Sequence, residues 1–226
     1  MSERYYTSAT QRLSTVPEVF TGSDLTVLFG WKSAVASTYL ALWRKAGLVK
    51  SLGGRSDVHM NLVQNRHVST EQALRRAYPR AIKLGVDVLR QAGWMTQIPS
   101  SVDVAIPKSS SLHHIEGFNL KQRSDTWFER VAAGVSKVSI GVNQLQPAWA
   151  LADMVARAQD RRVADAWLPD PDDLDMDAVF ADRALPVATL ALDAALSEPD
   201  DYEAIYTAWF ESRLHRGQAK QGKEQR

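Results

Sequence analysis

The chain of 226 residues contains no cysteine. This absence excludes disulfide bonds, thiolate nucleophiles and cysteine-ligated zinc, and it is typical of proteins of the reducing cytoplasm. Long apolar runs are also lacking, because the longest, residues 187–196, is interrupted by Asp193 and is far too short to span a bilayer. Residues 1–13 lack the apolar core of a signal peptide. We therefore expect a cytoplasmic protein without a membrane partner.

The short motifs of common catalytic sites are missing too. The sequence has no Walker A motif, GxGxxG, HExxH or GxSxG. His113 and His114 are adjacent, so in a strand they would point to opposite faces, and we expect surface positions rather than metal ligands. Residues 170–177 are rich in aspartate but lack the glycine and the bidentate glutamate of a calcium-binding loop. The sequence therefore predicts no enzyme, no metal site and no cofactor.

Charge is distributed unevenly along a chain whose formal net charge is only +1. Residues 1–66 contain eight Lys/Arg against four Asp/Glu, and residues 67–137 contain ten against six, so each segment is +4. Residues 138–212 contain four against fifteen, which gives −11, and residues 213–226 contain five against one, which gives +4. This asymmetry favours a front half that binds a polyanion and an acidic rear half, although an acidic block can also serve solubility alone.

Residues 21–63 have the pattern of two helices followed by a β-hairpin. The first helix is expected to begin at Thr21 or Ser23 and to end at Gly30. A second helix is expected over 33–46. Two half-buried strands then flank a Gly-Gly pair that suits a tight turn. This order predicts a winged helix-turn-helix, which most often binds DNA; the alternative is a small helical module that docks protein.

The second helix is the candidate element for reading DNA. At about 100° per residue, its apolar side chains gather on one side. The other side has small, hydroxyl-bearing or basic residues and no acid, as a helix in the major groove requires. The expected apolar face consists of Val35, Tyr39, Leu42, Trp43 and Ala46. The predicted DNA contacts are Lys32, Ser33, Ser37, Thr38, Arg44 and Lys45, with Gly54 and Arg55 at the tip of the wing.

Beyond the hairpin, helices and strands are expected to alternate without a regular βαβ repeat, so the predicted class is α+β. One of these helices is expected to start at Pro79 and end before Gly93. The predicted domains are a winged helix-turn-helix over 1–66, a mixed α+β domain over 67–212 and a basic, disordered tail over 213–226. A row of basic residues along two predicted helices either extends the DNA contact surface or is an ordinary solvated face. This row consists of Arg75, Arg76, Arg80, Lys83 and Arg90.

Two strings in this second region carry a resemblance. They are YPRAIKLGVDVLRQAGWMTQIPSSVDVAIPKSS, residues 78–110, and QLQPAWALADMVARA, residues 144–158. Together they resemble the C-terminal part of AbiEi-family antitoxins, and the likeness extends over about residues 15–180. Its most specific pieces are GWMTQIP at 93–99 and PAWALAD at 147–153.

The resemblance implies an N-terminal winged helix and a C-terminal α+β domain in a type IV toxin–antitoxin system. The first domain would bind inverted repeats in its own promoter and repress the operon. The second would be needed to neutralise a nucleotidyltransferase-like toxin encoded beside it, without a stable complex. An alternative stays open, in which the acidic C-terminal region of a protein-interaction module binds a basic partner, or the toxin, directly.

Overall fold

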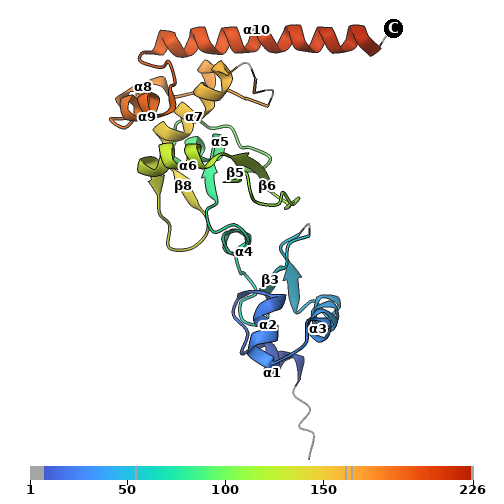
Figure 1. Cartoon of the computed structure of the whole chain (residues 1–226). Coiled ribbons are helices and arrows are strands. Elements are labelled where there is room, and N and C mark those ends of the chain that lie inside the picture. The colour runs from blue at the N-terminus through green and yellow to red at the C-terminus, as the bar shows by residue number, and fades with distance from the viewer. Residues whose placement is uncertain (1–7, 54, 161, 164, 225–226) are drawn as a thin grey trace, which may run out of the picture. The chain divides into compact units, whose positions relative to one another are not determined.

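The computed structural model is an α+β protein and describes residues 8–53, 55–160, 162–163 and 165–224 (Figure 1). The chain divides into two compact units. Unit 1 comprises Met1–Ala81, Ile106–Gln122 and Val138–Asn143, and unit 2 comprises Ile82–Ala105, Arg123–Lys137 and Gln144–Arg226. The units interleave along the chain, whereas the segments predicted from the sequence, 1–66, 67–212 and 213–226, are consecutive.

Unit 1 begins with a three-stranded antiparallel sheet and four helices. The strands lie in the order β1-β3-β2, and His59 of the central strand is opposite Phe20 on one side and Ser51 on the other. Leu13, Phe20, Leu25 and Trp43 are buried in the core of this unit. The elements are α1 (Ala9–Leu13), β1 (Val19–Thr21), α2 (Gly22–Phe29), α3 (Ser33–Lys45), β2 (Val49–Ser51), β3 (Val58–Asn61) and α4 (Thr70–Ala77).

The central strand β3 corrects one expectation. The alternation of residues 58–62 predicts a half-buried strand, yet all four residues of β3, Val58–Asn61, are buried. The reason is that α4 packs against β3 and β1, and this contact lies far beyond the hairpin in sequence. Asn61 is accommodated because its side-chain amide donates to the carbonyls of Leu13 and Val16, at 2.7 and 2.9 Å.

The second sheet has five strands in the order β6-β5-β4-β8-β7. Its strands are β4 (Ile82–Leu84), β5 (Val102–Pro107), β6 (Phe118–Arg123), β7 (Val135–Ser136) and β8 (Asn143–Leu145). The prediction of a helix from Pro79 is wrong over its first half. Residues 82–84 form strand β4, and only α5 (Val86–Gln91) is helical. Gly85 separates the two elements at a φ of 76°, a conformation that glycine adopts without strain.

Unit 2 is built around one buried helix, α7 (Pro147–Gln159). Residues 148–155 of this helix are all buried, and Trp149 lies against the backbone of Gly134, where a Cβ would be only 2.1 Å from the indole. The buried Asp153 accepts a hydrogen bond from Trp127 Nε1 at 2.6 Å and pairs with Arg123 at 3.4 Å. The PAWALAD string therefore encodes the centre of this unit.

Further helices complete unit 2. They are α6 (Asp125–Val131), η1 (Ala132–Gly134), η2 (Pro171–Asp173), α8 (Met176–Ala181), α9 (Leu185–Leu192) and α10 (Pro199–Glu224), the long helix in Figure 1. Since α10 runs to Glu224, it includes most of the segment for which the sequence predicts disorder. Residues 213–224 contain no proline, and half of them are Gln, Lys or Arg, which favour helix even without an apolar face.

Candidate nucleic-acid interface

The candidate site starts with the junction of α2 and α3. The two helices are bent by 115° relative to each other, across residues 30–32. Gly30 ends α2 in the left-handed region, with φ of 63° and ψ of 26°. Thr21 is the N-cap of α2, and it exchanges hydrogen bonds with Asp24 in a capping box. The predicted limits of this helix are confirmed.

The buried face of α3 is rotated from the predicted one. Ala36, Leu40 and Trp43 are buried, but Val35 and Leu42 are 39% and 56% exposed. Apolar residues occupy most of the circumference of this helix, so helical periodicity alone does not determine which side packs inward. The packing of α3 against α2 and β2 selects the side with Trp43.

The predicted contact residues of α3 do lie on its surface. The exposed ones are Lys32, Ser33, Ser37, Thr38, Arg44 and Lys45. Lys32, rather than Ser33, is the N-cap residue, and its side chain makes no cap hydrogen bond. The Thr38 hydroxyl donates to the carbonyl of Ala34 at 2.9 Å. The structure thus gathers six of the eight predicted residues along one helix.

The other two predicted residues belong to the hairpin between β2 and β3. Arg55 is exposed in this turn, and Gly54 lies outside the described residues. The preceding Gly53 has a φ of 117°, and a Cβ there would be 3.3 Å from the carbonyl oxygen of His114. The hairpin therefore touches the loop that follows β5 within unit 1.

His59 is a residue that sequence reasoning assigned to the wrong environment. It is buried in β3, with Nε2 3.6 Å from the carboxylate of Asp57 and with Nδ1 unpaired among the described residues. Burial lowers the pKa of His59; Asp57 opposes this shift, and the positive charge of Arg44 adds to it. The positive charge of Arg44, on the candidate recognition helix α3, thus disfavours protonation of the His59 imidazole.

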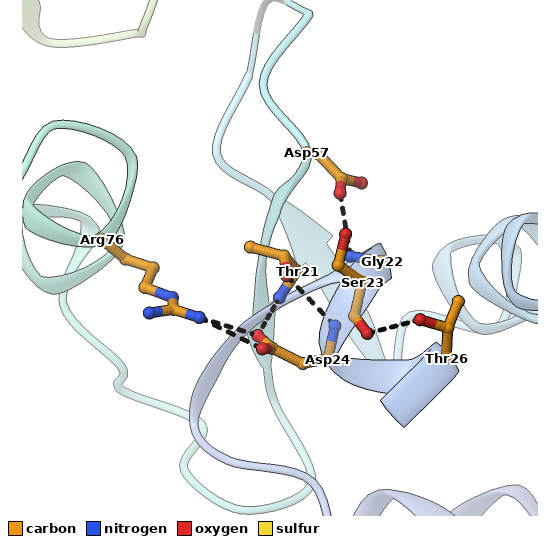
Figure 2. A network of polar contacts seen from close by, with 7 residues as sticks. All are labelled: Thr21, Gly22, Ser23, Asp24, Thr26, Asp57 and Arg76. Carbon is orange, nitrogen blue, oxygen red and sulfur yellow. Dashed lines mark hydrogen bonds and ion pairs between the residues drawn. The ribbon is translucent and has the colours of Figure 1, made fainter. Parts of the chain in front are cut away.

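A polar network fixes the N-terminus of α2 (Figure 2). The Asp57 carboxylate accepts from the backbone N–H of Gly22 at 3.1 Å, and Arg76 of α4 donates to both carboxylate oxygens of Asp24 at 3.1 and 3.2 Å. Partial burial alone would raise the pKa of Asp24, but hydrogen bonds from Thr21 and the charge of Arg76 hold it below the ordinary value. The network joins α2 to the base of the hairpin and to α4.

Most of the basic row has partners within the protein. Arg75 donates to the carbonyls of Val138 and Gly141, and Arg76 pairs with Asp24. In unit 2, Lys83 is buried, and Arg90 pairs with Asp87 at 3.0 Å. Arg80 is exposed and also interacts with another group of the protein. These contacts favour a structural role for the row over an extended DNA surface.

Several residues of the acidic block cap helices. Asp170 accepts from the N–H of Asp172 at the start of η2, Asp175 accepts from Ala178 at the start of α8, and Asp201 accepts from Ser197 and Glu198. Asp170 also accepts from the hydroxyl of Tyr206 at 2.9 Å. Much of the negative charge therefore stabilises unit 2 itself, and this weakens the case for a surface dedicated to a basic partner.

Among the described helices, none by itself is long and apolar enough to cross a bilayer. Only α2 and α3, taken together across their bend, have the length and composition of a membrane-spanning segment.

Similarity to known proteins is low. No family model matches the chain, and no curated protein matches it. The crystal structure of the RV2827C protein from Mycobacterium tuberculosis is similar to it, with 16% sequence identity and a TM-score of 0.46 over 85% of this chain and 77% of that chain.

Proposed function

We propose that unit 1 contains a winged helix-turn-helix that binds duplex DNA, with α3 in the major groove and the hairpin after β2 as the wing. The observation that carries the proposal is the exposure of α3, an acid-free helix set at 115° to α2 across a three-residue turn with a left-handed glycine. Helix-turn-helix motifs have such angles and turns, and their second helix enters the groove.

Charge on this surface supports the proposal. Lys32, Arg44 and Lys45 are exposed on and beside α3, and Lys50 and Arg55 are exposed on the adjoining hairpin. Phosphate contacts by such side chains supply much of the affinity of DNA-binding proteins and make it dependent on salt. Ser33 and Ser37, in the first turns of α3, are placed for contacts with base edges.

Binding of the full chain to DNA from its own promoter region tests the proposal by fluorescence anisotropy. The Arg44→Ala and Arg55→Ala substitutions should each weaken binding and each lower the slope of log affinity against log salt by about one. Arg162→Ala is the matched control, because Arg162 is an exposed arginine of unit 2 that pairs with Asp160. Equal affinities of the double variant, the control and the unsubstituted chain would refute DNA binding through this surface.

We further propose, from the resemblance to AbiEi-family antitoxins, that DNA binding represses the chain's own operon and that the rest of the chain neutralises a nucleotidyltransferase-like toxin. Full-length variants suit the test better than a fragment ending at residue 66, since that fragment would lack α4, which packs on β1 and β3. In a strain that expresses the toxin encoded beside the chain, the Arg44→Ala/Arg55→Ala double variant should lose repression and still restore growth. Failure of the unsubstituted chain to restore growth would refute the antitoxin role.

A further inference from the structure

We propose that α3 recognises thymine through its methyl group, so that the preferred DNA presents thymines to the exposed apolar residues of this helix. The inference rests on the proposed function and adds which base α3 recognises. It begins with Val35 and Leu42, which lie seven residues apart on the same side of α3 and are 39% and 56% exposed. Two exposed branched side chains on one side of a helix that has no acidic residue form an apolar strip that is available to a partner surface.

The exposed part of α3 forms an arc around the helix, and methyl groups also line the middle of this arc. At about 100° per residue, Ala34, Thr38 and Ala41 lie in its middle, between the side with Val35 and Leu42 and the opposite side. All three are exposed. The hydroxyl proton of Thr38 is donated within the helix, to the carbonyl of Ala34. In the turns that precede Lys45, the middle of the arc therefore offers methyl groups rather than free donors.

Hydrogen-bonding groups are confined to one side and to the end of α3. Ser37 and Arg44 lie seven residues apart on the side away from Leu42. Lys45 is in the last turn. The two sides of α3 can therefore contact different parts of DNA. The side with Arg44 suits phosphates, and the side with Leu42 suits an apolar group.

The chemistry of the major groove identifies that group. Guanine, cytosine and adenine present donors and acceptors there, whereas thymine adds the C5 methyl group, which apolar side chains contact. Alanine, valine and leucine side chains cannot satisfy the donors and acceptors of the other bases, so placing them there leaves polar groups desolvated without partners. The apolar face of α3 therefore complements thymine, the base that presents a methyl group in the major groove.

The occupant is DNA rather than a second protein surface because of charge. α3 has no acidic residue, and its last turn contains Arg44 and Lys45, both of them exposed. A second copy of the same helix would oppose these cations with cations, whereas a phosphate backbone would complement them. Pairing of two copies through α3 is an outcome that the experiment below separates.

Removing the methyl group alone tests the inference. The full chain is first used to select a duplex from random sequences, and that duplex is then synthesised with deoxyuridine in place of thymidine. The affinity should fall by about four-fold for each methyl group that is contacted, as expected for one buried methyl-sized group. Leu42→Ala should weaken binding to the thymine duplex by a similar factor and should leave binding to the uracil duplex almost unchanged.

The matched control is Leu28→Ala on α2, because Leu28 is also an exposed leucine, 49% accessible, but lies outside α3. It should bind both duplexes as the unsubstituted chain does. Both leucines are exposed, so thermal unfolding of all variants should coincide. Equal affinity of the unsubstituted chain for the thymine and uracil duplexes would overturn the inference while leaving DNA binding intact.

Two further outcomes are decisive. A chain that selects no sequence and binds no duplex would refute the proposed function itself. A Leu42→Ala variant that changes the sedimentation of the free protein, with the preference for thymine unaltered, would assign the apolar side of α3 to contact between copies and would overturn the inference.

Discussion

Replacing Asn61 by aspartate should destabilise unit 1 more than any comparably small change on its surface. Asn61 is at the end of β3 and is 0% exposed. Its Nδ2 donates to the carbonyls of Leu13 and Val16, and its Oδ1 accepts from the N–H groups of Val63 and Gln64 at 3.1 and 3.4 Å. Every hydrogen-bonding position of the amide is thereby used.

The magnitude follows from these contacts. Asn61→Asp keeps the shape of the side chain but turns the donor of two hydrogen bonds into an acceptor. The buried carbonyl of Val16 then loses its donor, at a cost of about 1–3 kcal/mol, and the carbonyl of Leu13 keeps only the N–H of Val16, at 3.1 Å, at a further cost of about 0.5–1.5 kcal/mol. A loss of about 1.5–4.5 kcal/mol in the free energy of unfolding is therefore expected, which is a large part of the stability of a small domain.

The loss should depend on pH. A carboxyl group that is buried against two carbonyls has a folded pKa raised above the value of about 3.9 in the unfolded chain. The folded state then holds its proton more tightly, so destabilisation grows as pH rises above that unfolded value and is relieved on acidification. At low pH the protonated carboxyl can donate one of the two lost hydrogen bonds.

Urea unfolding monitored by tryptophan fluorescence at pH 5 and pH 8 provides the measurement, since Trp31 and Trp43 report on unit 1. Asn65→Asp is the control, because aspartate keeps the hydrogen bond from the N–H of His67 at 2.9 Å and loses only a long, exposed one, from Nδ2 to the Glu18 carboxylate at 3.5 Å. It should cost less than about 1 kcal/mol. Destabilisation by Asn61→Asp no larger than that of the control, or one that does not change with pH, would refute the reasoning.

Two more predictions concern a glycine and a histidine. Gly134→Ala should lower the free energy of unfolding of unit 2 by about 3 kcal/mol or more, because its Cβ would lie 2.1 Å from the ring of Trp149 in a close-packed core; a variant with an unchanged midpoint in thermal unfolding would contradict the contact. His59→Phe should make the stability of unit 1 less sensitive to acid, since burial lowers the pKa of His59, with Asp57 opposing. The unfolded chain then takes up a proton as pH falls below about 6.5 while the folded state does not, and stability is lost at up to about 1.4 kcal/mol per pH unit until the lowered folded pKa is reached. The measurement is urea unfolding of the unsubstituted chain and of the His59→Phe variant between pH 7.5 and 5. Equal losses of unfolding free energy in the two proteins would show that groups other than His59 cause the acid sensitivity.

Local signals predicted the limits of α2 well. Thr21 and Asp24 form a capping box, and Gly30 adopts the left-handed conformation that ends a helix. These features depend only on neighbouring residues, so they can be read from a short window of sequence. The exposure of the polar contact residues on α3 was likewise predicted, since polar and basic side chains seldom pack inward.

Long-range contacts explain the failures. The apolar side chains of α3 allow more than one inward face, and packing on α2 and β2 exposes Leu42. His59 is buried because α4, from outside the hairpin, covers β3. Residues 82–84 pair with β5 as a strand, in spite of their helix-like periodicity, since Ile82 lies opposite Ala105 in the sheet. In each case a partner distant in sequence decides the outcome.

The polar network at the start of α2 ties the β2–β3 hairpin to the N-terminus of this helix. Asp57 follows the hairpin turn, and its carboxylate contacts both the N–H of Gly22 and the imidazole of His59. Its negative charge is thus directed at the positive end of α2. Arg76 contacts Asp24 in the same network, so α4 is tied to the helix that precedes α3. Arg76 therefore contributes by positioning the DNA-binding elements that we propose, whereas Arg44 and Arg55 lie outside this network and are among the exposed cations that would meet phosphates in that proposal.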